Sequence, residues 1–212
     1  VKTVGLVLPT LLSGEIEGWR NMGYPGVTST TEELLKYWFE EEKEDGINFH
    51  LCQQQVIETV IYCHEILGIA TPYQLYEKFA SDHTEVSQAK RSKALQDELN
   101  PITFPKYCLK MATGSGKTWV LNALIVWQFF NAINGEHLRS SEGTFQPAPL
   151  GFTTRFLIVT PGKEVQKRIL DAIQGTEEKP PDLDHPLFMP PGVRWRDRFH
   201  LEIYTPTEFR DN

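Results

Sequence analysis

The apolar positions in the first third of the chain repeat at helical spacing. A capping-box pattern over 29–32 predicts the start of a helix that Gly46 ends. A second apolar stripe predicts a helix over 51–67 that Gly68 stops, and Pro72 opens a third helix. The inward faces of the first two helices contain Leu34, Leu35, Trp38, Phe39, Val56, Ile57, Val60 and Ile61.

Short continuous apolar runs alternate with helical patterns in the second half of the chain. A buried strand is predicted from Lys106, before a helix over 117–134 that is apolar on nearly all faces. A second strand over 155–160 precedes a helix over 163–172, and a further strand is expected at 200–204. Because strands and helices alternate, this part predicts an α/β fold with a parallel sheet covered by helices.

The other segments carry weaker patterns. Residues 1–28 show no helical periodicity, although Leu6-Val7-Leu8 could form a strand. Residues 175–198 carry five prolines and are interpreted as loop. We therefore divide the chain into an N-terminal extension, residues 1–100, and a second part, residues 101–212.

The most specific chemistry lies in Met111-Ala-Thr-Gly-Ser-Gly-Lys-Thr118, between a predicted strand and a predicted helix. Gly114 and Gly116 allow the backbone to curl so that its N–H groups face phosphate oxygens. Lys117 supplies a cation for the β and γ phosphates, and the Thr118 hydroxyl is a ligand for Mg²⁺. The sequence therefore predicts a Walker A loop that binds ATP and Mg²⁺, although the general pattern has glycine where this chain has Met111.

Composition narrows the setting of this chemistry. The net charge of −7 over 212 residues argues against a dedicated basic nucleic-acid module, without excluding a local DNA-binding groove. The cysteines Cys52, Cys63 and Cys108 lack metal spacing and lie in apolar stretches, which suggests reduced core thiols of a cytoplasmic protein, with His64 at the surface. The helix over 117–134 is too short and too interrupted to span a membrane.

These motifs resemble those of superfamily-two helicases and translocases, in particular the DNA-translocating Res subunit of type III restriction enzymes. The loop beginning Met111-Ala-Thr-Gly resembles their motif I, and Phe156-Leu-Ile-Val-Thr-Pro-Gly162 resembles the next motif. Upstream, Tyr24-Pro-Gly-Val-Thr-Ser-Thr-Thr31, Trp38 and Cys52-Gln53 resemble the N-terminal part of the family. The resemblance implies a P-loop, RecA-like parallel sheet behind a helical N-terminal extension.

The resemblance also implies residue roles. Gln53 falls where the family has an adenine-reading glutamine, and the resemblance favours that role. Without the resemblance, an exposed residue at a helix start is the better explanation. Phe49 could stack on adenine or pack onto the following helix. Thr160, Pro161 and Gly162 would contact the DNA backbone without reading bases, or form an ordinary turn. The predicted nucleotide-binding residues are Gln53, Thr113, Gly114, Ser115, Gly116, Lys117 and Thr118, with Lys117 and Thr118 also catalytic and Thr118 the Mg²⁺ ligand.

The family also needs an Asp-Glu pair on a strand after motif I, and Asp97-Glu98 comes before the loop, in the wrong context. We therefore expect this chain to be the N-terminal part of a longer motor protein. The parent would be an ATP-dependent helicase or restriction endonuclease of a DNA defence system. The chain alone is expected not to hydrolyse ATP. Its expected partners are double-stranded DNA and a modification or other defence subunit, with no membrane. Two alternatives stay open: a P-loop kinase or nucleotide-sensing ATPase of another class, and a module that docks a partner subunit.

Overall fold

The computed structural model of the protein describes residues 7–68, 74–75, 78–79, 108–135, 137–139, 145–147 and 151–204. Their helices are α1 (Val7–Asn21), α2 (Ser29–Phe39), α3 (Leu51–Ile61), α7 (Lys117–Asn134) and α8 (Lys163–Gln174). A π-helical turn, η2 (Tyr62–Ile66), continues α3, and two 3₁₀ turns follow α8, η3 (Asp182–Asp184) and η4 (Arg196–Arg198). Two short strands, β1 (His137–Arg139) and β2 (Phe145–Pro147), pair antiparallel.

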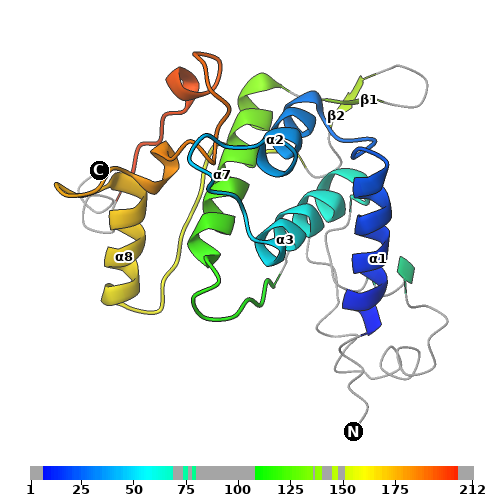
Figure 1. The fold of residues 1–212 in the computed structure, drawn as a ribbon, viewed down its shortest axis with the longest axis horizontal. Coiled ribbons are helices and arrows are strands. Elements are labelled where there is room, and N and C mark those ends of the chain that lie inside the picture. Colours follow the sequence, from blue (N-terminus) through cyan, green and yellow to red (C-terminus); the bar gives the residue numbers. More distant parts are fainter. Residues whose placement is uncertain are drawn as a thin grey trace, which may run out of the picture.

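Helix α7 is the centre of the packing. Helices α2 and α3 lie against one side of it, α8 runs on the other side, and α1 packs on α3 (Figure 1). The predicted bounds of α7 are confirmed, and Gly135 closes it in the left-handed conformation at φ 60°. Because apolar side chains cover most of its surface, it can bury several faces at once. Its buried apolar residues are Val120, Ala123, Ile125, Val126, Trp127, Phe129 and Phe130.

The predicted parallel sheet is wrong for the residues that the structure describes. The described part of the strand predicted from Lys106 forms no ladder, and neither do 155–160 or 200–204. Leu157 and Val159 are 89% and 82% exposed, so the run over 155–160 does not form the predicted buried strand. An apolar run favours a strand only where another strand pairs with it, and the only pairing among the described residues is the unpredicted β1–β2 hairpin.

Helix α1 is absent from the sequence interpretation, which found no helical pattern in residues 1–28. Leu12, Ile16 and Trp19 nevertheless follow at intervals of four and three residues and are buried. Gly14 and Gly18 interrupt this stripe and lower the helix propensity of the segment. Packing against α3 therefore stabilises this helix although its local helix preference is weak. Because α1 begins at Val7, the described part of Leu6–Leu8 is helix and not the strand considered there.

Two predicted helix boundaries change. The N-cap of α2 is Thr28, whose Oγ1 accepts the N–H of Thr31 at 3.1 Å, so the capping box expected over 29–32 is wrong. The helix ends at Phe39 rather than Gly46, since the acidic run that follows would place carboxylates at its negative C-terminal end.

The other helices agree better with the sequence. The helix predicted over 51–67 is confirmed as α3 with its π-helical turn, and Gly68 at φ 58° ends it. The helix expected from Pro72 lies largely outside the described residues. The parts of it that are described, residues 74–75 and 78–79, are helical. Helix α8 confirms the prediction over 163–172, and 175–198 is loop apart from its two short 3₁₀ turns. No helix in the described part of the chain is long and apolar enough to cross a membrane.

A buried ion pair joins α1 to α3. The fully buried carboxylate of Glu58 accepts Arg20 Nε at 2.8 Å and Nη2 at 2.5 Å, and Arg20 has a raised pKa because of this bond. Tyr24 donates its hydroxyl to Glu58 Oε1 at 2.8 Å, and burial raises the pKa of that hydroxyl. Gln54 donates to the same oxygen at 2.9 Å. Four donated bonds therefore compensate the burial of one carboxylate.

We expect Arg20→Met to lower the free energy of unfolding by about 3 kcal/mol, because it leaves the Glu58 carboxylate buried without its cation. The double variant Arg20→Met with Glu58→Met should recover most of this loss, since it removes the charge as well. Urea denaturation of the three proteins measures both effects. A double variant as unstable as Arg20→Met would contradict this account of the pair.

Candidate functional site

The glycine-rich loop has the backbone shape that the sequence predicts. Gly114 and Gly116 adopt φ values of 79° and 75°, which side chains with a Cβ rarely adopt. Gly116 is also the N-cap of α7 and has no side chain to cap the first N–H groups of the helix. The loop therefore ends at a helix N-terminus whose backbone donors and dipole favour an anion.

One backbone carbonyl oxygen accepts several hydrogen bonds from residues of the loop. Ala112 O accepts Lys117 Nζ at 2.6 Å, Ser115 Oγ at 2.7 Å and Ser115 N at 3.3 Å. The Lys117 side chain is therefore folded back over its own loop, with its ammonium group exposed. A neutral, exposed carbonyl oxygen binds an ammonium group more weakly than a charged phosphate oxygen does. Lys117 is thus held beside the loop by a contact that an anion could replace.

Gln53 reaches this loop from α3, which is 62 residues away in the sequence. Its Nε2 donates to Ser115 O at 3.1 Å and to Gly116 O at 3.4 Å. Its Oε1 accepts the backbone N–H of His50 at 2.8 Å, as in a capping box at the start of α3. The side chain is 4% exposed, so the interpretation of Gln53 as an exposed residue is wrong. The structure brings Gln53 together with the predicted loop residues, through the loop backbone.

A cleft of about 740 Å³ opens between α1, α3 and the loop. Its walls are largely apolar, and Met111, Ala112 and Ser115 form its edge on the loop side. The sequence interpretation missed this cleft because it missed α1. The repeat of Leu8, Leu12 and Ile16 at intervals of four residues was the available signal. The apolar residues that line the cleft are Leu8, Leu12, Ile16, Leu51, Val56 and Met111.

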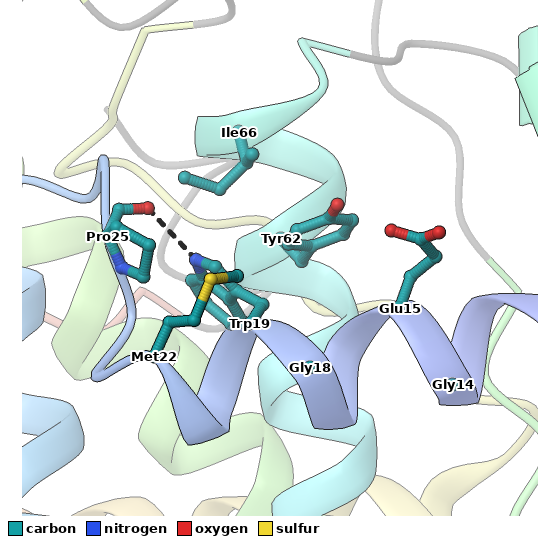
Figure 2. Close-up of a pocket in the computed structure, with 8 residues that line it drawn as sticks. All are labelled: Gly14, Glu15, Gly18, Trp19, Met22, Pro25, Tyr62 and Ile66. Atoms are coloured by element: carbon teal, nitrogen blue, oxygen red, sulfur yellow. Dashed lines mark hydrogen bonds between the residues drawn. The ribbon is translucent and has the colours of Figure 1, made fainter.

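A second groove, of about 400 Å³, lies at the other end of α3 and contains none of the predicted site residues. Figure 2 shows it between α1 and the π-helical turn, with Trp19 Nε1 donating to Pro25 O at 3.0 Å on its floor. Phe49 faces neither opening. It is buried against the rings of Trp38, Phe39 and Phe188, so it packs in the core and is not available to stack on a base.

The predicted DNA-contacting residues lie at the start of another helix. Pro161 and Gly162 are exposed and Thr160 is partly exposed, with its Oγ1 3.5 Å from Gly162 O. Gly162 is the N-cap of α8 and, like Gly116, has no side chain to cap it. Both helices begin at the lower end of the molecule in Figure 1. The two uncapped helix starts therefore lie toward the same end of the protein.

The remaining predicted loop residues are Thr113 and Thr118. Thr113 is exposed and Thr118 partly exposed, beside the loop turn. In the described part of the chain, no three His, Cys, Asp or Glu side chains gather as a metal site would require. The pair Asp97-Glu98 lies outside the described residues.

The cysteine prediction is confirmed for one residue of three. Cys63 is buried, which raises the pKa of its thiol to about 12, whereas Cys52 and Cys108 are exposed. His64 is buried rather than at the surface as predicted, since its ring packs on Trp127 and Phe152.

Comparison with known proteins supplies the family. The model of the family described as the res subunit of type III restriction enzymes matches residues 47–185, about two-thirds of the chain. The chain belongs to this family. The match covers α3, the loop with α7, and α8, so it contains every predicted site residue of this Res-family chain. The family is ATP-dependent and helicase-like. No curated protein and no solved structure matches the chain.

The two loop glycines form a matched pair for mutagenesis. A Cβ at Gly114 would meet nothing within 4 Å, whereas one at Gly116 would lie 2.2 Å from Gln53 Nε2. We expect Gly114→Ala to cost about 1 kcal/mol of stability from its positive φ alone, and Gly116→Ala to cost clearly more because Gln53 must also move. Urea denaturation gives both values. Equal losses would show that Gln53 does not hold the loop in this position.

Proposed function

We propose that this Res-family chain binds Mg-ATP at the loop of residues 111–118, as part of an ATP-dependent helicase or translocase of a type III restriction or related DNA defence system. The observation that carries the proposal is the curled loop, with both glycines at positive φ, ending at the uncapped N-terminus of α7. Such an arrangement presents backbone N–H groups and a positive dipole to a polyphosphate.

Lys117 provides the exchangeable cation of the site. Its ammonium group lies 2.6 Å from Ala112 O, a neutral acceptor, so a γ- or β-phosphate oxygen offers it a charged partner at little conformational cost. In the proposal, Lys117 leaves this carbonyl and binds phosphate, while the Thr118 hydroxyl is a ligand of Mg²⁺. The residues present suit the cofactor because loop amides, an ammonium group and a hydroxyl are the donor types that Mg-ATP requires.

The nucleoside has room beside the loop. The 740 Å³ cleft continues from Met111 and Ala112 between α1 and α3, and its apolar walls suit a flat heterocycle. Gln53 is not among the residues that line this cleft. We propose from its place in the family motif that it nevertheless contributes to adenine recognition. Its Oε1 keeps one lone pair beyond the bond from His50, and its bond to Gly116 O is the longer of its two donated bonds.

DNA contact is assigned to Thr160, Pro161 and Gly162. The exposed backbone at the start of α8 and the Thr160 hydroxyl suit a phosphodiester group, which carries no base information. Double-stranded DNA is therefore the proposed macromolecular partner, with a modification or other defence subunit as the second partner. We also propose that residues 1–212 bind nucleotide without sustained hydrolysis, because no Asp-Glu pair follows the loop in this sequence.

Titration calorimetry with Mg-ATP tests the nucleotide site. We expect Lys117→Ala to weaken binding by about 2–3 kcal/mol, the range for a charge-assisted hydrogen bond. Lys36→Ala is the matched control because Lys36 is exposed on α2, pairs with Glu32, and loses the same charge. Affinity that is unchanged in Lys117→Ala, or reduced equally in both variants, would reject the loop as the phosphate site.

Fluorescence anisotropy with labelled duplex DNA at low salt tests the second site. Thr160→Val should weaken binding about fivefold, the effect of losing one neutral hydrogen bond, and by the same factor on duplexes of unrelated sequence. Thr153→Val removes a hydroxyl from the same connecting segment, where Thr153 bonds to Arg155, and should leave DNA affinity unchanged. An effect of Thr160→Val confined to one duplex would contradict a backbone contact.

A further inference from the structure

The side chain of Gln53 connects the cap of one helix to the start of another. It accepts the N–H of His50 at the cap of α3 and donates to the carbonyls of Ser115 and Gly116 where α7 begins. These partners determine which end of the amide is nitrogen, because backbone carbonyls accept and a backbone N–H donates. The same amide, 4% exposed, thus has fixed partners at both ends.

Holding these carbonyls has a consequence on the other side of the loop. In a planar trans peptide, the C=O and the following N–H point in opposite directions. A bond to Ser115 O therefore turns the N–H of Gly116 away from Gln53. A bond to Gly116 O does the same for the N–H of Lys117, together with the bonds that this oxygen accepts within α7 from Trp119 N at 3.0 Å and Val120 N at 3.3 Å. These N–H groups belong to the loop that would receive the phosphates. Gln53 thereby orients loop donors that it does not itself contact.

We propose that Gln53 is a positioning residue for the phosphate loop. It holds the N–H groups of Gly116 and Lys117 toward a bound polyphosphate, whatever base is attached to that polyphosphate. This inference rests on the proposed function, because it needs polyphosphate to bind the loop. It differs from adenine recognition, since it requires Gln53 for ligands that have no base at all. Gln53 is thus a link between α3 and the phosphate site.

The residue type is part of the argument. Glutamate keeps the carboxyl oxygen that a capping box needs for the His50 N–H, but it has no N–H for the loop carbonyls. Methionine has similar length and neither group. The variant Gln53→Glu therefore keeps the bond at the cap of α3 and loses the bonds to the loop carbonyls. The variant Gln53→Met loses both kinds of bond without adding charge. Gln174, exposed at the end of α8 and not among the residues that line the cleft, accepts the same two substitutions as controls.

Magnesium tripolyphosphate is the probe because it carries phosphates without a base. We expect Gln53→Met and Gln53→Glu each to bind it about tenfold more weakly than wild type, as the loss of one or two hydrogen bonds predicts. Gln174→Met and Gln174→Glu should stay within about twofold, the Glu variant measuring the effect of added charge alone. Gln53→Glu should lower the thermal midpoint even though the cap of α3 survives, because its second carboxyl oxygen would face two carbonyl oxygens in a buried site. Gln53→Met is therefore the variant that tests the contact with the loop without a buried charge.

Amide NMR supplies a readout that general destabilisation would not move. The ¹H–¹⁵N resonances of Gly116 and Lys117 should shift on adding tripolyphosphate to wild type, and these shifts should shrink in both Gln53 variants. Unchanged affinity and shifts in the Gln53 variants would overturn the positioning role while leaving the proposed function intact. Weaker binding of ATP alone, with tripolyphosphate unaffected, would instead make Gln53 only a base-reading residue. If wild type does not bind tripolyphosphate through these amides, the proposed function fails and the inference with it.

Discussion

The position of α7 depends on a buried carboxylate, that of Glu65 in the π-helical turn. Its oxygens accept the Thr28 N–H at 2.9 Å, the Thr31 hydroxyl at 2.6 Å and Trp127 Nε1 at 2.7 Å. Asn131, one turn beyond Trp127, bonds to both threonines. A buried carboxylate without such donors would cost several kcal/mol, so these bonds constrain the start of α2, the π-helical turn and α7 to one arrangement.

This constraint reaches the candidate site because α7 begins at the glycine-rich loop. The Glu65 network positions the second half of α7 against α2. Gln53 connects Ser115 and Gly116, the residues just before α7, to the cap of α3. The Glu58 pair in turn holds α3 to α1, which forms one wall of the cleft beside the loop. Three polar contacts, each between segments distant in sequence, therefore orient the loop and the cleft relative to one another. A polar contact is suited to this role because its geometry is directional, whereas apolar packing alone tolerates small shifts.

The Res-family match agrees with the chemistry inferred from the loop, while the predicted sheet does not agree with the structure. The run over 155–160 shows why these two outcomes are compatible. Its apolar residues are those of a buried strand, yet Leu157 and Val159 are exposed among the described residues. Loop shape depends on local backbone preferences, whereas a strand depends on a partner that may lie far away in sequence.

Local signals in the sequence were sufficient for several features. The all-round apolar pattern and Gly135 determined α7, and Gly114 and Gly116 determined the curl of the glycine-rich loop, because each of these depends on backbone preferences within a few residues. Tertiary structure alone decided the rest. Helix α1 exists against a weak local propensity because its stripe packs on α3, and Gln53 became a buried contact of the loop only when segments 62 residues apart met. The position of a side chain in such contacts depends on how whole helices pack, and no local pattern encodes that.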